Sequence, residues 1–66
     1  MYKLIVICYL EDGSKITYTY QSNYIGSCFT RISAISEEFS SVHYEMYRLN
    51  GYKYELIEKG EFNERN

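Results

Sequence analysis

The fold of this chain is decided by three consecutive stretches: YKLIVICYL (residues 2–10), EDGS (residues 11–14) and KITYTYQ (residues 15–21). The first stretch is rich in β-branched and aromatic residues and is too short for a separate helix, while the third alternates strictly in polarity. The tetrapeptide between them has the composition of a turn. Together they predict an antiparallel β-hairpin.

Two loops are compatible with this hairpin. A two-residue loop at Asp12–Gly13 would place apolar residues of the first strand opposite a glutamine and two threonines. A three-residue loop, with Gly13 in the left-handed conformation, puts apolar residues opposite apolar residues, which is what fixes strand register. We therefore predict the three-residue loop, with the pairs Leu4–Tyr20, Val6–Tyr18 and Cys8–Ile16.

This register divides the hairpin into two faces, because successive side chains of a strand point to opposite sides. The inner face, which should meet the core, comprises Leu4, Val6, Cys8, Ile16, Tyr18 and Tyr20. The outer face comprises Ile5, Ile7, Tyr9, Thr17 and Thr19. Since the first strand is apolar on both faces, we expect it in the interior of the sheet.

A helix is predicted over residues 23–40, where apolar residues recur at helical spacing and form a single stripe. The stripe comprises Ile25, Cys28, Phe29, Ile32, Ile35 and Phe39. Ser22 is a candidate N-cap. Gly26 weakens the first turn, so the helix could instead begin at Ser27.

A second hairpin is predicted from strands over residues 42–49 and 52–58, on either side of the turn signal Asn50–Gly51. The preference for apolar neighbours again favours a bulged loop. The resulting pairs are Met46–Tyr54, Tyr44–Leu56 and Glu45–Glu55.

The element order β-β-α-β-β predicts an α+β fold, in which the two hairpins form one four-stranded sheet and the helix packs on one face. The order of the strands within the sheet does not follow from the sequence. We expect a single domain over residues 1–58, because 66 residues leave no room for a second one. The polar residues 59–66 are predicted to form a frayed C-terminal tail.

The longest apolar run, residues 4–10, is far shorter than the roughly 20 residues that a membrane-spanning helix needs, so no membrane association is expected. The N-terminal residues lack a cleavable secretory signal, which predicts a cytoplasmic protein, in the host cell if the chain is viral. In that reducing compartment Cys8 and Cys28 are expected to be free, buried thiols.

Catalysis by hydrolysis or group transfer needs a nucleophile, a base and an orienting group. The chain has one histidine, His43, and both cysteines point into the predicted core. Neither a C-x-x-C nor an H-x-x-x-H spacing exists for a metal, and no glycine-rich pattern exists for a phosphate. We therefore expect no enzymatic activity, no metal and no cofactor.

The outer face of the first hairpin is an apolar stripe, and such stripes commonly mark interfaces. We expect two copies of the chain to associate through it as a homodimer, using Ile5, Ile7, Tyr9, Thr17 and Thr19. The alternative is that the C-terminal tail covers this face through Phe62. A larger protein is expected to contact Arg31, Ala34, Glu37, Glu38, Glu45, Tyr47 and Lys53.

Nucleic acid binding is the alternative function, because exposed tyrosines on a sheet can stack on bases. The residues concerned are Tyr9, Tyr47, Lys15 and Lys53. Affinity for a phosphate backbone rests on clustered cations, however, and the net charge of this chain is −2. Protein binding is therefore the favoured function.

In length, in residue usage typical of AT-rich genomes and in its tyrosine-rich β surface, the chain resembles small virus-encoded proteins that bind and block host machinery. Inhibitors of bacterial defence systems are examples of this class. The resemblance is one of general character, rests on no motif and assigns no residue. It implies an inhibitor encoded by a phage or mobile element that blocks a host defence protein by occupying its surface.

Overall fold

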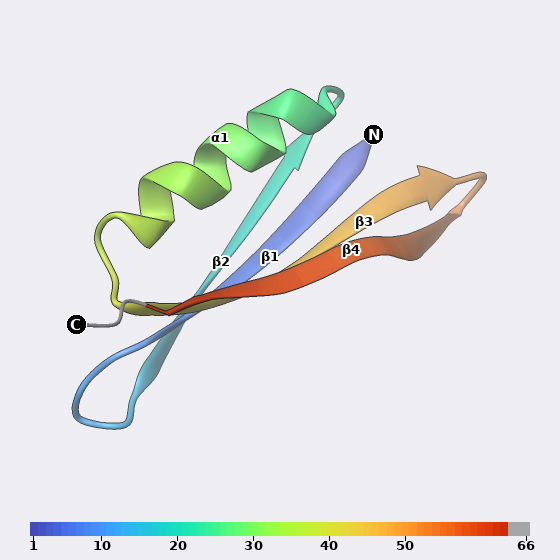
Figure 1. Ribbon diagram of the computed structural model, residues 1–66. Coiled ribbons are helices and arrows are strands. Elements are labelled where there is room, and N and C mark those ends of the chain that lie inside the picture. The colour runs from blue at the N-terminus through green and yellow to red at the C-terminus, as the bar shows by residue number, and fades with distance from the viewer. Residues whose placement is uncertain (64–66) are drawn as a thin grey trace.

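A computed structural model describes residues 1–63 of the chain. Its elements, in order, are β1 (Tyr2–Tyr9), β2 (Lys15–Ser22), α1 (Ile25–Ser36), β3 (Ser41–Asn50) and β4 (Lys53–Asn63). The strands form one open antiparallel sheet, and the helix lies across one of its faces (Figure 1). This two-layer arrangement confirms the predicted α+β fold.

The strands lie in the order β2-β1-β3-β4, so β1 occupies the interior of the sheet as predicted. The predicted register of the first hairpin is also confirmed, with Val6 opposite Tyr18. Gly13 has a φ of 92°, and its N–H donates to the carbonyl of Leu10 at 3.1 Å. The glycine thus supplies the left-handed position that a three-residue loop requires.

The predicted turn of the second hairpin is wrong by one residue. Asn50 pairs with Lys53, so the turn residues are Gly51 and Tyr52. Gly51 has a φ of 69° at the first turn position, which matches a two-residue type II′ turn. A short turn of this kind twists with the strands and needs no bulge next to it.

The predicted register of the second hairpin is wrong as a consequence. Glu45 lies opposite Lys59 instead of Glu55, and Glu55 lies opposite Arg48. Opposite charges directly across a pair of strands are favourable, whereas like charges are unfavourable. A bulge farther along leaves Ile57 without a counterpart on β3. The observed register therefore replaces the charge conflict of the predicted one with two favourable pairs.

Strand β4 continues beyond the predicted end at residue 58 and reaches Asn63, so residues 59–63 belong to the sheet and not to a frayed tail. Residues 64–66, the rest of the predicted tail, lie outside the described residues. Phe62 stacks on Tyr44 with ring centroids 5.7 Å apart, on the face that carries the helix. It does not cover the outer face.

Helix α1 is shorter than the predicted span of 23–40 and packs mainly on β1, β2 and β3. The predicted cap at Ser22 is wrong, because the N-cap is Tyr24 and its side chain makes no capping hydrogen bond. The Ser22 Oγ instead accepts a hydrogen bond from the Tyr24 N–H at 3.1 Å. Ile25 and Phe29 of the predicted stripe remain exposed, because the helix leaves β4 largely uncovered.

The core between the helix and the sheet is small. It comprises Leu4, Val6, Cys8, Cys28, Ile32, Val42, Tyr44 and Met46. Both cysteines are buried, as predicted, and neither forms a disulfide within residues 1–63. Ile16 and Tyr18 were expected on the covered face, but they are 37% and 42% exposed because β2 is an edge strand.

Gly60 allows the core to extend over β4. A Cβ at this position would lie 2.8 Å from the hydroxyl oxygen of Tyr44 and 2.9 Å from two of its ring carbons. The Tyr44 ring is held there by its stacking on Phe62 and by a hydrogen bond that its hydroxyl donates to Glu58 at 2.9 Å. Burial first, and then the contact with Glu58, raise the pKa of the Tyr44 hydroxyl.

We expect Gly60→Ala to lower the free energy of unfolding by about 1–3 kcal/mol, because the Tyr44 ring would have to leave its site. The matched control is Gly26→Ala, since nothing lies within 4 Å of a Cβ built at that helical position. The control should raise stability by up to about 1 kcal/mol, the helix propensity difference. Urea denaturation followed by circular dichroism measures both. A Gly60→Ala variant as stable as the wild type would contradict the argument.

Candidate functional site

The outer face of the sheet is the side opposite the helix (Figure 1). Ile5 and Ile7 of β1 lie at its centre and are half-buried by cross-strand neighbours. Thr19 and Thr17 flank them on β2, and Tyr9 is 43% exposed at the end of the row. The five residues predicted for self-association therefore share one surface.

A polar cluster borders the two isoleucines on β3. The Tyr47 hydroxyl donates to one carboxylate oxygen of Glu45 at 2.6 Å, and the His43 Nε2 lies 3.4 Å from the other. The His43 Nδ1 lies 3.6 Å from a carboxylate oxygen of Glu61 on β4. Cross-strand pairing brings His43 opposite Ile7 and Glu45 opposite Ile5. The cluster and the apolar centre therefore form one continuous surface.

This cluster keeps Glu45 ionised. The hydrogen bond from Tyr47, and next that from His43, lower the pKa of the Glu45 carboxyl. The same hydrogen bond raises the pKa of the Tyr47 hydroxyl. The carboxylate is thus held in a fixed orientation beside the apolar centre, where it can accept from a donor on another molecule.

Tyr54 also belongs to the outer face, contrary to the predicted register, which set it opposite Met46. It pairs with Leu49, and the Lys3 Nζ lies 5.2 Å from the centre of its ring. Gln21 of β2 donates to its hydroxyl at 3.3 Å. Tyr54 therefore reaches across one end of this face from β4 to β2. Only the correct register of the second hairpin would have placed it there.

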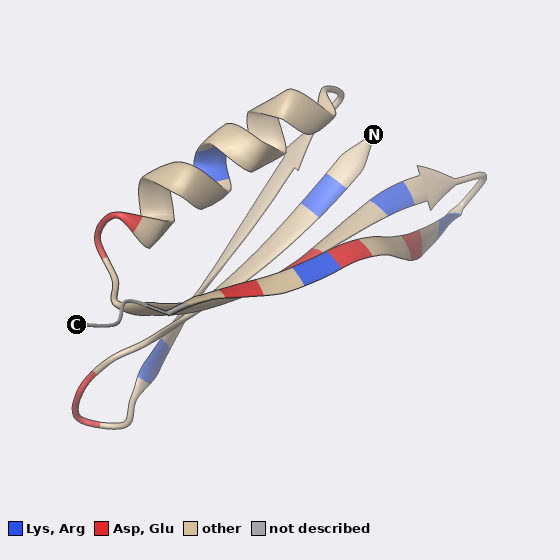
Figure 2. Ribbon diagram, viewed as in Figure 1, with Lys and Arg blue, Asp and Glu red and all other residues tan. Residues whose placement is uncertain are grey.

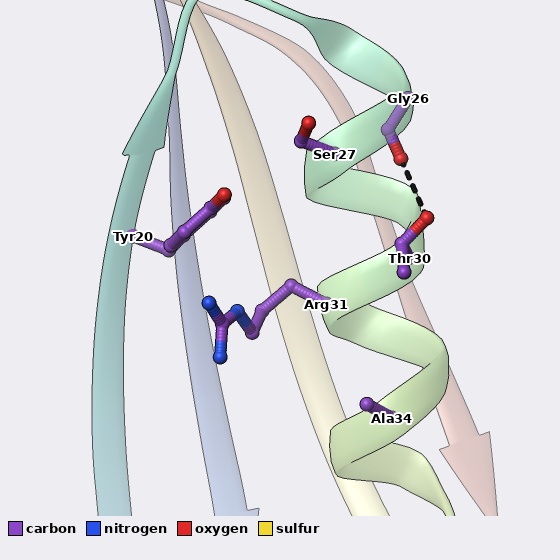
Figure 3. Close-up of a pocket in the computed structure, with 6 residues that line it drawn as sticks. All are labelled: Tyr20, Gly26, Ser27, Thr30, Arg31 and Ala34. Carbon is purple, nitrogen blue, oxygen red and sulfur yellow. Dashed lines mark hydrogen bonds between the residues drawn. The ribbon is translucent and has the colours of Figure 1, made fainter.

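A groove on the opposite face separates α1 from β2 (Figure 3). The Arg31 guanidinium lies over the Tyr20 ring, 4.5 Å from its centre. Ala34 leaves space beside Arg31, and Glu38 borders the groove just beyond the C-terminal end of the helix. The two adjoining hollows of this groove have volumes of about 540 and 450 Å³. Arg31, Ala34 and Glu38 were predicted as contact residues, and the structure brings them together.

The predicted partner-binding set is nevertheless not one site. Glu45 and Tyr47 lie on the outer face, whereas Arg31 and its neighbours lie on the helix side of the sheet. Glu37 is the C-cap of α1, and Lys53 begins β4 beside the second turn. The sheet itself therefore separates the set into two surfaces and two isolated residues.

The chemistry of the cysteines is that of core residues. Burial raises the pKa of the Cys8 thiol, with a smaller contribution from Glu38, and burial raises that of Cys28. A thiolate nucleophile needs the opposite shift. Within residues 1–63, no three His, Cys, Asp or Glu side chains are grouped so that they could hold a metal ion.

Charges of both signs are interspersed over the described elements. Two lysines and three glutamates are interspersed along β4, and α1 carries one arginine near its middle (Figure 2). This pattern gives no continuous basic stripe on residues 1–63. In the same residues no helix has the length and apolarity to cross a membrane.

Comparison of the chain with protein-family models, with curated proteins and with solved structures finds no match.

Tyr47→Phe should raise the pKa of Glu45 toward its ordinary value, because the variant lacks the hydroxyl that donates to the carboxylate. A lowered pKa contributes stability that is present above the unfolded-state value of about 4.3 and is lost as the pH falls through the folded-state value. The variant should therefore lose less stability on acidification than the wild type.

Titration of the Glu45 side-chain carboxyl carbon by NMR measures the pKa directly. Tyr52→Phe serves as the control, because Tyr52 is 94% exposed at the turn. An unchanged Glu45 midpoint in Tyr47→Phe would show that the hydrogen bond does not hold the carboxylate in solution.

Proposed function

We propose that this chain is a small non-enzymatic protein-binding module that acts by occupying a surface of a larger protein through its outer face. The observation that carries the proposal is the position of Ile5 and Ile7 beside the oriented Glu45 carboxylate. Neither the helix nor Phe62 lies over the two isoleucines. An apolar centre bordered by fixed polar groups is typical of protein interfaces.

The chemistry of the face defines the partner that fits it. Glu45 and Glu61 place two carboxylates around His43, next to the isoleucines. An apolar patch with a lysine or arginine beside it would complement this surface. A second copy of the chain fits it less well, because symmetric contact would bring the carboxylates of both copies to one interface.

Occupying a surface is a mode of inhibition. The general resemblance to small virus-encoded inhibitors supports a role in which a phage or mobile element supplies the chain to block a host protein, such as a component of a defence system. In that role the chain would act in the cytoplasm of the host cell. The extent of inhibition would depend on its affinity for the host protein.

Nucleic acid binding remains the second candidate, and one feature favours it. Tyr9 is exposed on the outer face at the end of β1, and Lys15 lies directly opposite it on β2. The hydroxyl of Tyr47, however, is engaged by Glu45. The carboxylates that border the centre of the same face would repel a phosphate backbone, so the protein-binding proposal is the stronger one.

Ile7→Glu should weaken capture of the partner by about tenfold or more, because it places a charge at the apolar centre of the interface. The chain would be immobilised and exposed to host lysate, and the retained proteins would be quantified by mass spectrometry. Tyr52→Glu is the matched control, since it adds the same charge at the exposed turn. A partner retained equally by all three proteins would contradict the assignment to the outer face.

The nucleic-acid alternative is tested by a mobility-shift titration with single-stranded and duplex DNA and RNA at two salt concentrations. We expect no shift at either. Binding that weakens steeply with salt would favour the alternative and count against the protein-binding module.

A further inference from the structure

The two edges of the sheet are protected to different degrees. β4 carries a bulge and five charged side chains: Lys53, Glu55, Glu58, Lys59 and Glu61. β2 carries one charged residue, Lys15, contains no proline and pairs with β1 without irregularity over all eight residues. Charges, bulges and prolines are the devices that keep an edge strand from pairing with another chain. β2 lacks nearly all of them.

Two hydrogen bonds establish which backbone groups of β2 face this open edge. The Leu10 N–H donates to the Ser14 carbonyl, and on the other side of β1 the Leu49 N–H donates to the Met1 carbonyl. Residues alternate between the two sides in an antiparallel ladder. The residues of β2 whose N–H and C=O groups face the open edge are therefore Lys15, Thr17, Thr19 and Gln21.

We propose that a second copy of the chain binds at this edge, with the two β2 strands antiparallel about a twofold axis at Tyr18. Thr17 then lies opposite the second copy's Thr19, and Lys15 lies opposite the second copy's Gln21. Every open N–H group of β2 meets a carbonyl in this register, so eight backbone hydrogen bonds join the copies. The two sheets become one continuous eight-stranded sheet.

The side chains at the edge support this register. Ile16 and Tyr18 are the exposed apolar residues that the helix leaves uncovered on β2. The register sets Tyr18 against the second copy's Tyr18, and Ile16 against the second copy's Tyr20. It thus buries large side chains that the single chain leaves in solvent, while Lys15 meets a neutral amide in place of another lysine.

Charge complementarity across the axis also supports the register. A twofold axis perpendicular to the sheet keeps both helices on the same side. Arg31 lies over Tyr20 (Figure 3). Glu38 lies farther along the groove and also borders a hollow with Tyr9 and Leu10. Among residues 1–63, neither side chain forms an ion pair within its own chain.

In this register, Tyr20 of one copy lies opposite Ile16 of the other. Glu38 lies toward the Ile16 end of β2, because it borders a hollow with Tyr9 and Leu10, and Tyr9 lies opposite Lys15. Arg31 of each copy therefore faces the second copy's Glu38. The interface contains this ion pair twice, once on each side of the axis.

A charge exchange tests the proposal by sedimentation at high micromolar concentration. The wild type should sediment as a dimer, while Arg31→Glu and Glu38→Arg should each weaken the dimer by about tenfold or more, because each brings like charges together at two places. A mixture of the two variants restores both attractive pairs and should form a heterodimer. A wild-type monomer, or folded variants that do not associate when mixed, would overturn the proposal.

Two further variants separate the edge from the outer face. Thr19→Pro removes an N–H that faces the open edge, so it should leave the sheet intact and abolish the dimer. Ile7→Glu should leave the dimer intact. Circular dichroism verifies that each variant is folded. A dimer that survives Thr19→Pro, or one that only Ile7→Glu dissociates, would show that the copies associate elsewhere. The proposal does not depend on the identity of the larger protein.

Discussion

One packing constraint governs the whole structure: a single helix of 12 residues is too narrow to cover one face of a four-stranded sheet. A helix with its side chains is about 10 Å across, and neighbouring strands lie about 4.8 Å apart, so a single helix covers two to three strands. It packs over β1 and the strands beside it. Over β4, which the helix leaves largely uncovered, the Tyr44 ring lies against Gly60 and extends the core.

The same constraint leaves two surfaces uncovered, the outer face of the sheet and the edge at β2. Within residues 1–63, nothing is packed against the outer face except its own side chains, and β2 lies at the margin of the helix with its backbone groups unpaired along one side. Such features in so small a domain are typical of a chain that gains part of its stability from association. The contrast between the β4 edge, which carries five charged residues, and the β2 edge, which carries one, indicates which edge is available to a further strand.

The first hairpin could be predicted in detail because its register is determined locally. Leu4, Val6 and Cys8 need apolar neighbours, and only a loop with Gly13 in the left-handed conformation supplies them. The register of the second hairpin depended on contacts that the sequence does not reveal. The fit of the Tyr44 ring over Gly60 and the opposition of Glu45 and Lys59 lie far from the turn. A prediction that only matches apolar residues across the turn takes no account of these distant contacts.

The alternation of side chains along β1 and β2 predicted the correct face for each residue. It could not predict which residues of different elements lie close together. Arg31 and Glu45 were expected to share a partner, yet they lie on opposite sides of the sheet. This separation makes the two proposed associations compatible. Pairing through β2 about an axis perpendicular to the sheet leaves both outer faces on one side, so a dimer presents twice the contact surface of a monomer. Association through the outer face itself would instead hide Ile5 and Ile7 from any larger protein.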